Sequence, residues 1–216
     1  MGGEALESVV LDGRGVVGDR WFAVEDDEGR FASGKNSHRF RRRDAVFEFA
    51  ASTDGDAVRV QRDAQQWTVG EADLDRVLSQ AMGATVRVLP EEHVPHQDAG
   101  SVSLIGTASL AWCRDHLDVD GDFRRIRPNI VVETTEPFVE ETWVGSRLTV
   151  GDVLLSLVER IERCRMVDLA QDGVGTTAPL LKRLSAAREM CLGVYADVVT
   201  PGGIGVGDEV RVDRAR

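Results

Sequence analysis

Cysteine is scarce in this chain. Only 3 of the 216 residues are cysteines, and no two of them form a Cys-x-x-Cys pair. This count excludes a disulfide framework, offers no zinc-site pattern and is too low for a 2Fe–2S cluster held by four thiolates. No nicotinamide- or flavin-binding fingerprint appears either. A redox reaction at this protein would therefore need electrons from outside the chain.

Long apolar runs and positive charge are also scarce. No hydrophobic run approaches the roughly 20 residues of a membrane-spanning helix, and the N-terminus lacks a signal-peptide pattern. The chain has 37 acidic residues against 26 basic ones, which gives a net charge of −11. So acidic a chain should repel nucleic acid and anionic membranes. We therefore expect a cytoplasmic protein that binds neither of them.

Short strand patterns dominate what is present. Hydrophobic residues make up 42% of the chain, enough for a sizeable core. Strands are predicted at 16–24, 30–32, 46–50, 58–61, 67–69, 86–89, 102–105, 130–132, 148–150, 153–157, 194–199 and 209–212. Helices are predicted at 72–82, 107–117 and 178–190, the second of them capped by Thr107 or Ser109. Many short strands with two or three helices predict a mixed α+β, β-barrel-like fold.

The stretch 91–100 interrupts these patterns. It holds two histidines and no apolar rhythm, so we expect a loop near the functional site. His93 and His96 are expected to be exposed there, and proton chemistry on a substrate is the alternative.

Two segments carry candidate chemistry. The run 125–132 places two arginines and Asn129 directly before a β-branched stretch, which would present anion-binding side chains from the start of a buried strand. Arg163 and Arg165 flank Cys164, and we expect two neighbouring guanidinium groups to favour its nucleophilic, metal-binding thiolate form. A thiolate beside an anion-binding patch suits a soft metal carried on a phosphorylated organic cofactor.

Each segment also has a plain structural explanation. Arg-Pro-Asn at 127–129 can be a turn whose asparagine bonds its own backbone. The arginines around Cys164 can face solvent and pair with Glu159 and Glu162, and a lone cysteine is more often inert core than ligand. The two segments alone leave the function open.

Several motifs follow one another in a familiar order. They are Arg-Pro-Asn-Ile-Val-Val at 127–132, Trp-Val-Gly-Ser at 143–146, Leu-Thr-Val-Gly-Asp at 148–152 and Arg-Cys at 163–164. Together they resemble the signature of the MOSC domain, a family named for the C-terminal part of molybdenum cofactor sulfurase. Gly-Asp-Arg-Trp-Phe at 18–22 and Gly-Arg-Phe at 29–31 resemble the segment that precedes the domain in the amidoxime-reducing branch.

The resemblance implies a MOSC-type β-barrel-like fold, with a β-rich N-terminal region over 1–84 and the MOSC domain over 85–216. One departure concerns the start of the chain. Members of this branch normally begin with a strand that ends in a Pro-x-Lys-Ser type turn, whose lysine and serine contact the cofactor. This chain begins with the region that follows such a turn. We therefore expect that the first strand is missing or that the true start lies upstream.

The resemblance also assigns roles to individual residues. Cys164 would ligate molybdenum as a thiolate, or carry a persulfide in a sulfur-transfer reaction. Arg127 would hold the phosphate of the molybdenum cofactor as a charged fork, and Asn129 would hold the same cofactor as a neutral hydrogen-bonding group. Arg20, in the Gly-Asp-Arg motif, would also contact the cofactor.

Further residues complete the predicted site. Ser109 would either bond the same ligand or cap its helix. Lys35 belongs to a basic run that family members place over the cofactor, so we expect it to focus an anion together with Arg39, although such a run is usually a solvated loop. Cys113 and Cys191 are expected to pack in the core.

The resemblance implies a molybdenum cofactor-dependent reductase of N-hydroxylated or N-oxide compounds. Such an enzyme would take a small-molecule substrate and a separate electron-donor protein. Two alternatives remain: a non-redox persulfide carrier or cofactor-binding module, and a degenerate binding domain that has lost the cofactor. Pyridoxal phosphate, the cofactor of sulfurase relatives, is not expected, because its chemistry needs a separate large domain and 216 residues leave no room for one.

Overall fold

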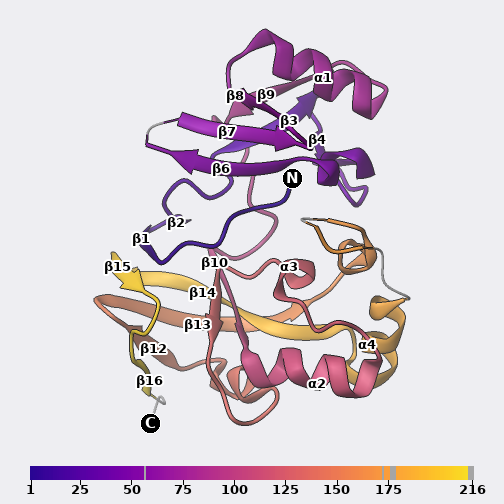
Figure 1. Ribbon diagram of the computed structural model, residues 1–216. Helices are drawn as coiled ribbons and strands as arrows, with labels where there is room; N and C mark the ends of the chain where they lie inside the picture. Colours follow the sequence, from indigo (N-terminus) through magenta and orange to yellow (C-terminus); the bar gives the residue numbers. More distant parts are fainter. Residues whose placement is uncertain (56, 172, 176–178, 214–216) are drawn as a thin grey trace. The chain divides into compact units, whose positions relative to one another are not determined.

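The computed structural model describes residues 1–55, 57–171, 173–175 and 179–213 (Figure 1). Contacts divide the chain into two compact units. The first unit comprises Met1–Ala5, Arg20–His96 and Leu169–Thr176, and the second comprises Leu6–Asp19, Gln97–Asp168 and Thr177–Arg216. No helix in the described ranges is long and apolar enough to cross a membrane.

The described residues of the first unit form two small sheets and one α-helix. A four-stranded sheet has the order β5-β4-β3-β9, and a three-stranded sheet has the order β6-β7-β8. The strands are β3 (Phe22–Asp26), β4 (Phe31–Ser33), β5 (Phe40–Arg42), β6 (Ala50–Asp54), β7 (Ala57–Arg62), β8 (Gln65–Thr68) and β9 (Val86–Pro90). Helix α1 (Ala72–Met82) has the predicted bounds, because Leu74 and Leu78 are fully buried and Gly83 ends it with a left-handed φ of +63°.

Two strands predicted in the N-terminal part of the chain differ from the structure. Residues 46–50 were expected to be extended, but a 3-10 helix (Asp44–Glu48) buries Val46 and Phe47, and strand β6 begins only at Ala50. An apolar cluster without strict alternation does not distinguish these two conformations.

The predicted strand over 16–24 is interrupted. Gly18 has φ +90° and Arg20 has φ +56°, and left-handed backbone cannot continue a strand. Strand β2 (Gly15–Val16) therefore ends before these residues, and β3 begins after them.

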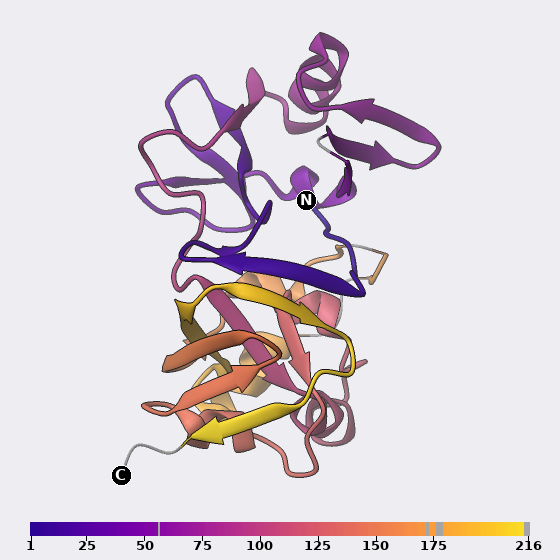
Figure 2. The ribbon, with the colours of Figure 1, turned by 90° about the vertical axis from the view of Figure 1, so that its left-hand side faces the viewer.

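The second unit is built on a six-stranded sheet of order β11-β10-β14-β13-β12-β16. Its strands are β10 (Val102–Gly106), β11 (Ile130–Val132), β12 (Arg147–Val150), β13 (Val153–Glu162), β14 (Cys191–Thr200) and β16 (Val210–Asp213). Register shifts between β13 and β14 mark bulges, which bend a sheet. A second sheet pairs β1 (Ser8–Asp12) with β15 (Gly202–Gly205) and β2, as Figure 2 shows.

Helices α2 (Thr107–Leu117) and α4 (Leu180–Arg188) cover one face of this sheet. Ile105 of β10 and Leu192 of β14 belong to the same apolar core as residues of both helices, whereas the adjacent residue Leu104 belongs to a second apolar core. Position 178, where the third predicted helix was expected to begin, lies outside the described residues.

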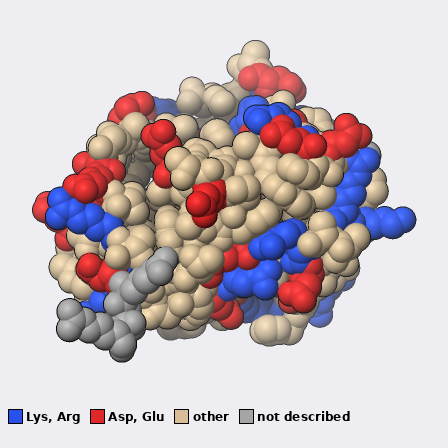
Figure 3. Space-filling model, turned by 90° about the horizontal axis from the view of Figure 1, so that it is seen from below, with Lys and Arg blue, Asp and Glu red and all other residues tan. Residues whose placement is uncertain are grey.

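The mixed α+β, β-barrel-like fold predicted from the sequence is confirmed. The described residues contain four α-helices rather than two or three, because α3 (Phe123–Ile126) is a single turn without apolar periodicity. On the face seen in Figure 3, acidic and basic side chains are interspersed with uncharged ones. This face is therefore not uniformly acidic, although the chain has a net charge of −11.

Candidate functional site

Cys164 lies in a turn at the end of the longest strand pair. Strand β13 ends at Glu162, and a 3-10 helix (Arg165–Asp168) begins directly after Cys164. The carbonyl oxygen of Cys164 accepts a hydrogen bond from Val167 N at 3.2 Å. Its thiol is free and half-buried, so it can be reached by a ligand while the backbone around it is held.

The side chain of Arg163 points into the protein. Its Nε donates to the carbonyl oxygen of Leu192 at 2.8 Å, and its Nη1 donates to that of Ile126 at 2.9 Å. The alternative in which this arginine faces solvent and pairs with Glu159 or Glu162 is therefore wrong. Because Ile126 precedes Arg127 in the chain, the guanidinium joins the Cys164 turn to the Arg-Pro-Asn segment.

The remaining nitrogen of this guanidinium, Nη2, is buried and has no hydrogen-bond partner among the described residues. It lies over Gly193, where an added Cβ would come within 3.1 Å of it and within 2.7 Å of the carbonyl oxygen of Leu104. Burial lowers the pKa of Arg163 to about 10, and the nearby Tyr195 and Cys164 act in the opposite direction. The group therefore keeps its charge at neutral pH, with an unused donor.

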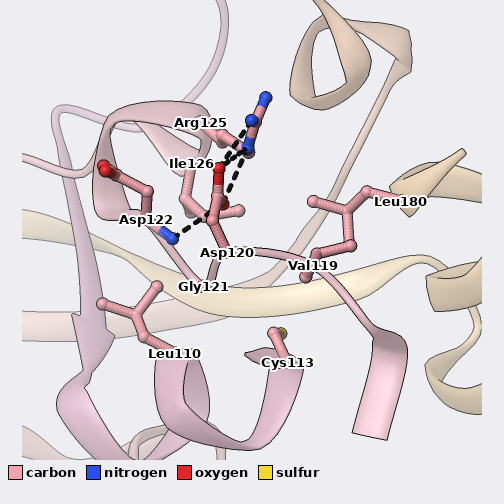
Figure 4. Close-up of a pocket in the computed structure, with 9 residues that line it drawn as sticks. All are labelled: Leu110, Cys113, Val119, Asp120, Gly121, Asp122, Arg125, Ile126 and Leu180. Atoms are coloured by element: carbon pink, nitrogen blue, oxygen red, sulfur yellow. Dashed lines mark hydrogen bonds and ion pairs between the residues drawn. The ribbon is translucent and has the colours of Figure 1, made fainter. Parts of the chain in front are cut away.

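Arg125 and Arg127 differ sharply in their surroundings. Arg125 is buried and pairs with Asp120, with 2.6 Å between Nη2 and Oδ2 (Figure 4). Arg127 ends α3 with a left-handed φ of +55°, and its N–H donates to the carbonyl oxygen of Phe123 at 2.8 Å. Its side chain is half-buried. Arg125 thus stabilises the fold through its buried ion pair. The half-buried Arg127 is the better placed of the two to bind a ligand.

Asn129 is held between two distant segments. Its Oδ1 accepts hydrogen bonds from the backbone N–H and the hydroxyl of Ser103, both at 2.9 Å. Its Nδ2 donates to Asp19 Oδ2 at 2.8 Å. The alternative in which Asn129 bonds its own backbone is not what the structure shows. The Gly-Asp-Arg motif and the Arg-Pro-Asn motif meet through this contact.

Ser109 is fully buried and its hydroxyl is already bonded. It donates to Glu140 Oε1 at 2.6 Å and accepts from Phe138 N at 2.7 Å. The capping alternative is wrong for Ser109, because α2 has Gly106 at its N-cap and its Ala108 N–H donates to a threonine hydroxyl, that of Thr134, at 3.1 Å. A ligand role for Ser109 would require its hydroxyl to exchange one of these bonds.

Arg20 and Lys35 lie in the first unit. His96 Nδ1 is 3.0 Å from the carbonyl oxygen of Arg20, and since a carbonyl only accepts, this ring nitrogen carries the hydrogen. His96 is 8% exposed, so the expectation of an exposed side chain is wrong for it. Lys35 Nζ and Arg39 Cζ lie 5.1 and 5.2 Å from the centroid of the Phe40 ring, close enough for cation–π attraction.

The hollow in Figure 4 is too small for an organic cofactor. It lies between α2, α3 and the start of α4 and leaves room for about 10 Å³, close to the space of one buried water. Cys113 lines it, and burial raises the pKa of this thiol to about 12. The core position predicted for Cys113 is confirmed, whereas Cys191 is only half-buried at the start of β14.

The donor set fits a metal that arrives with its own organic ligand. In the described ranges, no three His, Cys, Asp or Glu side chains gather into a site that could hold a bare metal ion. The second unit instead offers one accessible thiol beside a buried guanidinium and the half-buried Arg127 and Asn129. Sequence reasoning missed Asp19 and Ser103 as the residues that orient Asn129, although Asp19 stands in the Gly-Asp-Arg motif.

The sequence of this chain is similar to that of several known proteins. A model of the MOSC domain family matches residues 91–211, more than half of the chain. Mitochondrial amidoxime-reducing component 1 of Homo sapiens is 28% identical over 134 residues, which cover 56% of this chain and 39% of that protein. Molybdenum cofactor sulfurase of Danio rerio is 32% identical over 80 residues, 36% of this chain and 9% of that protein. The chain thus spans about two fifths of the amidoxime-reducing relative.

Among solved structures, the YUAD protein from Bacillus subtilis is similar with a TM-score of 0.48 and 11% identity, covering 99% of this chain and 88% of that one.

Proposed function

This chain belongs to the MOSC domain family, and from that premise we propose that it binds a molybdenum cofactor and reduces N-hydroxylated or N-oxide compounds. One arrangement carries the proposal: the free thiol of Cys164 adjoins a buried guanidinium with an unused donor, and that guanidinium is tied to the segment of Arg127. A buried, unpaired charge is costly, so a site of this kind suits an anionic ligand.

Each candidate site residue has a distinct role in this proposal. Cys164 is the single protein ligand to molybdenum, and a soft thiolate suits that metal. Arg127 binds the phosphate of the cofactor with a charge-assisted hydrogen bond, and Asn129 adds a neutral one. Ser109 and, in the first unit, Arg20 and Lys35 keep the cofactor-binding roles that the family resemblance implies.

The bound cofactor would supply the two-electron oxygen-atom chemistry. The chain has no thiolate set for an iron–sulfur cluster, so the reductant must come from a separate electron-donor protein. The substrate is proposed to be a small molecule. The cytoplasmic location stays a prediction, which fractionation of cells would check.

A second candidate function rests on the same thiol. A half-buried, free Cys164 can also carry a persulfide, in which case the protein is a sulfur carrier that performs no reduction.

Metal and pterin content test the proposal. The protein would be produced in a host that makes the cofactor and purified, and its molybdenum and its oxidised, fluorescent pterin would be measured per chain. We expect both in near-equal amount to the protein. A preparation without either, including one with an upstream in-frame extension, would favour the degenerate-domain alternative, and an added sulfur atom on Cys164 in the intact mass would favour the carrier.

A further inference from the structure

The carboxamide of Asn129 has a fixed orientation. Its Oδ1 faces the backbone N–H of Ser103, which can only donate, and its Nδ2 faces the carboxylate of Asp19, which accepts. Exchanging the oxygen and nitrogen would set two donors against each other at Ser103 and two acceptors against each other at Asp19. The contacts therefore fix which end of the amide is which.

These contacts occupy both acceptor positions of the Asn129 carboxamide but only one of its two donor hydrogens. An amide oxygen has two lone pairs, and the N–H and hydroxyl of Ser103 occupy both, each at 2.9 Å. An amide nitrogen has two hydrogens, of which one is donated to Asp19 at 2.8 Å. No acceptor in the described part of the chain takes the other hydrogen, and the side chain is half-buried.

We propose that Asp19 is a positioning residue that makes Asn129 a donor-only contact for the ligand. The ligand must then present an acceptor, an oxygen or an unprotonated ring nitrogen, to Asn129, and a donor at that point is refused. This inference rests on the proposed function, because it takes Asn129 as facing the cofactor. It adds the direction of the hydrogen bond and the residue that sets it.

If the contact between Asp19 and Asn129 served only to stabilise the fold, a different result would be expected. Asp19 and Asn129 are 110 positions apart, so their contact also fastens the segment after β2 to the start of β11. If that were its whole purpose, any pair of side chains that restores the contact would restore every property of the protein. The direction of the hydrogen bond separates the two explanations.

Exchanging the two side chains tests the direction. Asn129→Asp alone sets two carboxylates at hydrogen-bonding distance, so we expect the melting temperature to fall by roughly 4 °C or more. The double variant Asp19→Asn with Asn129→Asp restores a donor–acceptor pair in the reverse direction, and Ser103 can still donate to the new carboxylate. Its melting temperature should return to near that of the wild type.

The exchanged protein no longer offers a donor to the ligand. We expect its molybdenum and pterin content, measured after purification from a cofactor-producing host, to fall at least about tenfold, since a hydrogen bond is replaced by repulsion between acceptors. Asp115→Asn is the control: it makes a carboxylate-to-carboxamide change in an exposed ion pair with Arg114, outside the proposed site, so its cofactor content should equal that of the wild type.

The outcomes are distinct. A stable exchanged protein that keeps its full cofactor content overturns the donor role, as does an exchanged protein that stays as unstable as Asn129→Asp. A wild-type protein without molybdenum and pterin rejects the proposed function and the ligand contact together, a pattern that neither of the other results gives.

Discussion

The guanidinium of Arg163 donates a hydrogen bond from Nη1 to the carbonyl oxygen of Ile126, at 2.9 Å. Arg163 directly precedes Cys164, and Ile126 directly precedes Arg127. One side chain therefore couples the turn that carries the thiol to the turn that carries the predicted phosphate-binding arginine. The contact is possible because position 193 is a glycine, which leaves space for the guanidinium beside β10.

Gly193→Ala should destabilise the second unit and disturb this coupling. A Cβ at position 193 would lie 2.7 Å from a backbone carbonyl oxygen, and φ is +78° there. The left-handed backbone costs about 1–2 kcal/mol for a non-glycine residue, and the backbone contact adds to it, so we expect a loss of about 3 kcal/mol in urea unfolding. Gly145→Ala is the control, because Gly145 has φ +85° but open space around its Cβ position. Equal losses from the two variants would contradict the close approach.

Cys164→Ser should remove molybdenum and activity with little effect on the fold, because a hydroxyl is a poorer ligand than a thiolate for a soft metal. Cys113→Ser should do the reverse, because Cys113 is 2% exposed and a buried hydroxyl without a partner costs about 1–3 kcal/mol. Metal analysis and thermal unfolding of both proteins provide the measurements. If the two variants lose metal to the same extent, Cys164 is not the ligand.

Arg127→Ala should weaken cofactor binding more than Arg125→Ala at matched stability. Loss of a charge-assisted hydrogen bond costs about 1.5–3 kcal/mol, roughly ten- to a hundredfold in affinity. Arg125→Ala should mainly lower stability, because Arg125 is 4% exposed and its removal leaves Asp120 without its partner. Cofactor content per folded chain, after unfolded protein is removed, compares the two. A larger loss from Arg125→Ala would place the ligand on the other side of α3.

The ion pair between Asp120 and Arg125 should make stability depend on pH. A side-chain hydrogen bond from Arg125 lowers the pKa of Asp120 below its ordinary value of 3.8. The pair therefore contributes fully above the unfolded pKa, and its contribution is lost as the pH falls below 3.8 through the folded pKa.

Asp120→Asn should thus cost about 1–2 kcal/mol at pH 7, a modest value because the aspartate side chain is 40% exposed, and the difference from the wild type should shrink at the lowest pH at which the protein is folded. Asp115→Asn, in the exposed pair with Arg114, is the control and should change stability by less than about 0.5 kcal/mol. Urea unfolding across the acid range measures both. A difference for Asp120→Asn that does not depend on pH would contradict the assignment.

A structural feature could be predicted from the sequence when the residues that determine it lie close together in the chain. The bounds of α1 were predictable because Leu74 and Leu78 repeat at helical spacing and Gly83 stops the helix. Helix α3 was not, because it is one turn long and places a charged residue, Arg125, in the interior, where an acid five residues upstream pairs with it.

The candidate site shows the same division. The identities of Cys164, Arg127 and Asn129 follow from local motifs. Their orientation depends on partners far away in the sequence: Arg163 bonds carbonyl groups 29 and 37 residues away, and Asn129 bonds Asp19 over 110 residues. Such long-range contacts produce no periodic pattern of residues from which they could be predicted.

Reduction of an N-hydroxylated base or amidoxime should require an external electron donor. The chain has 3 cysteines and no nicotinamide- or flavin-binding fingerprint, so nothing in its composition replaces the two electrons that each turnover consumes. We expect the cofactor-loaded protein to turn over anaerobically with a chemically reduced viologen dye, but not with NADH alone, and Cys164→Ser to be inactive with both. Turnover with NADH alone would show that a donor site exists within the chain. No turnover of any N-oxygenated substrate by the loaded protein, together with a persulfide on Cys164, would decide for the sulfur carrier.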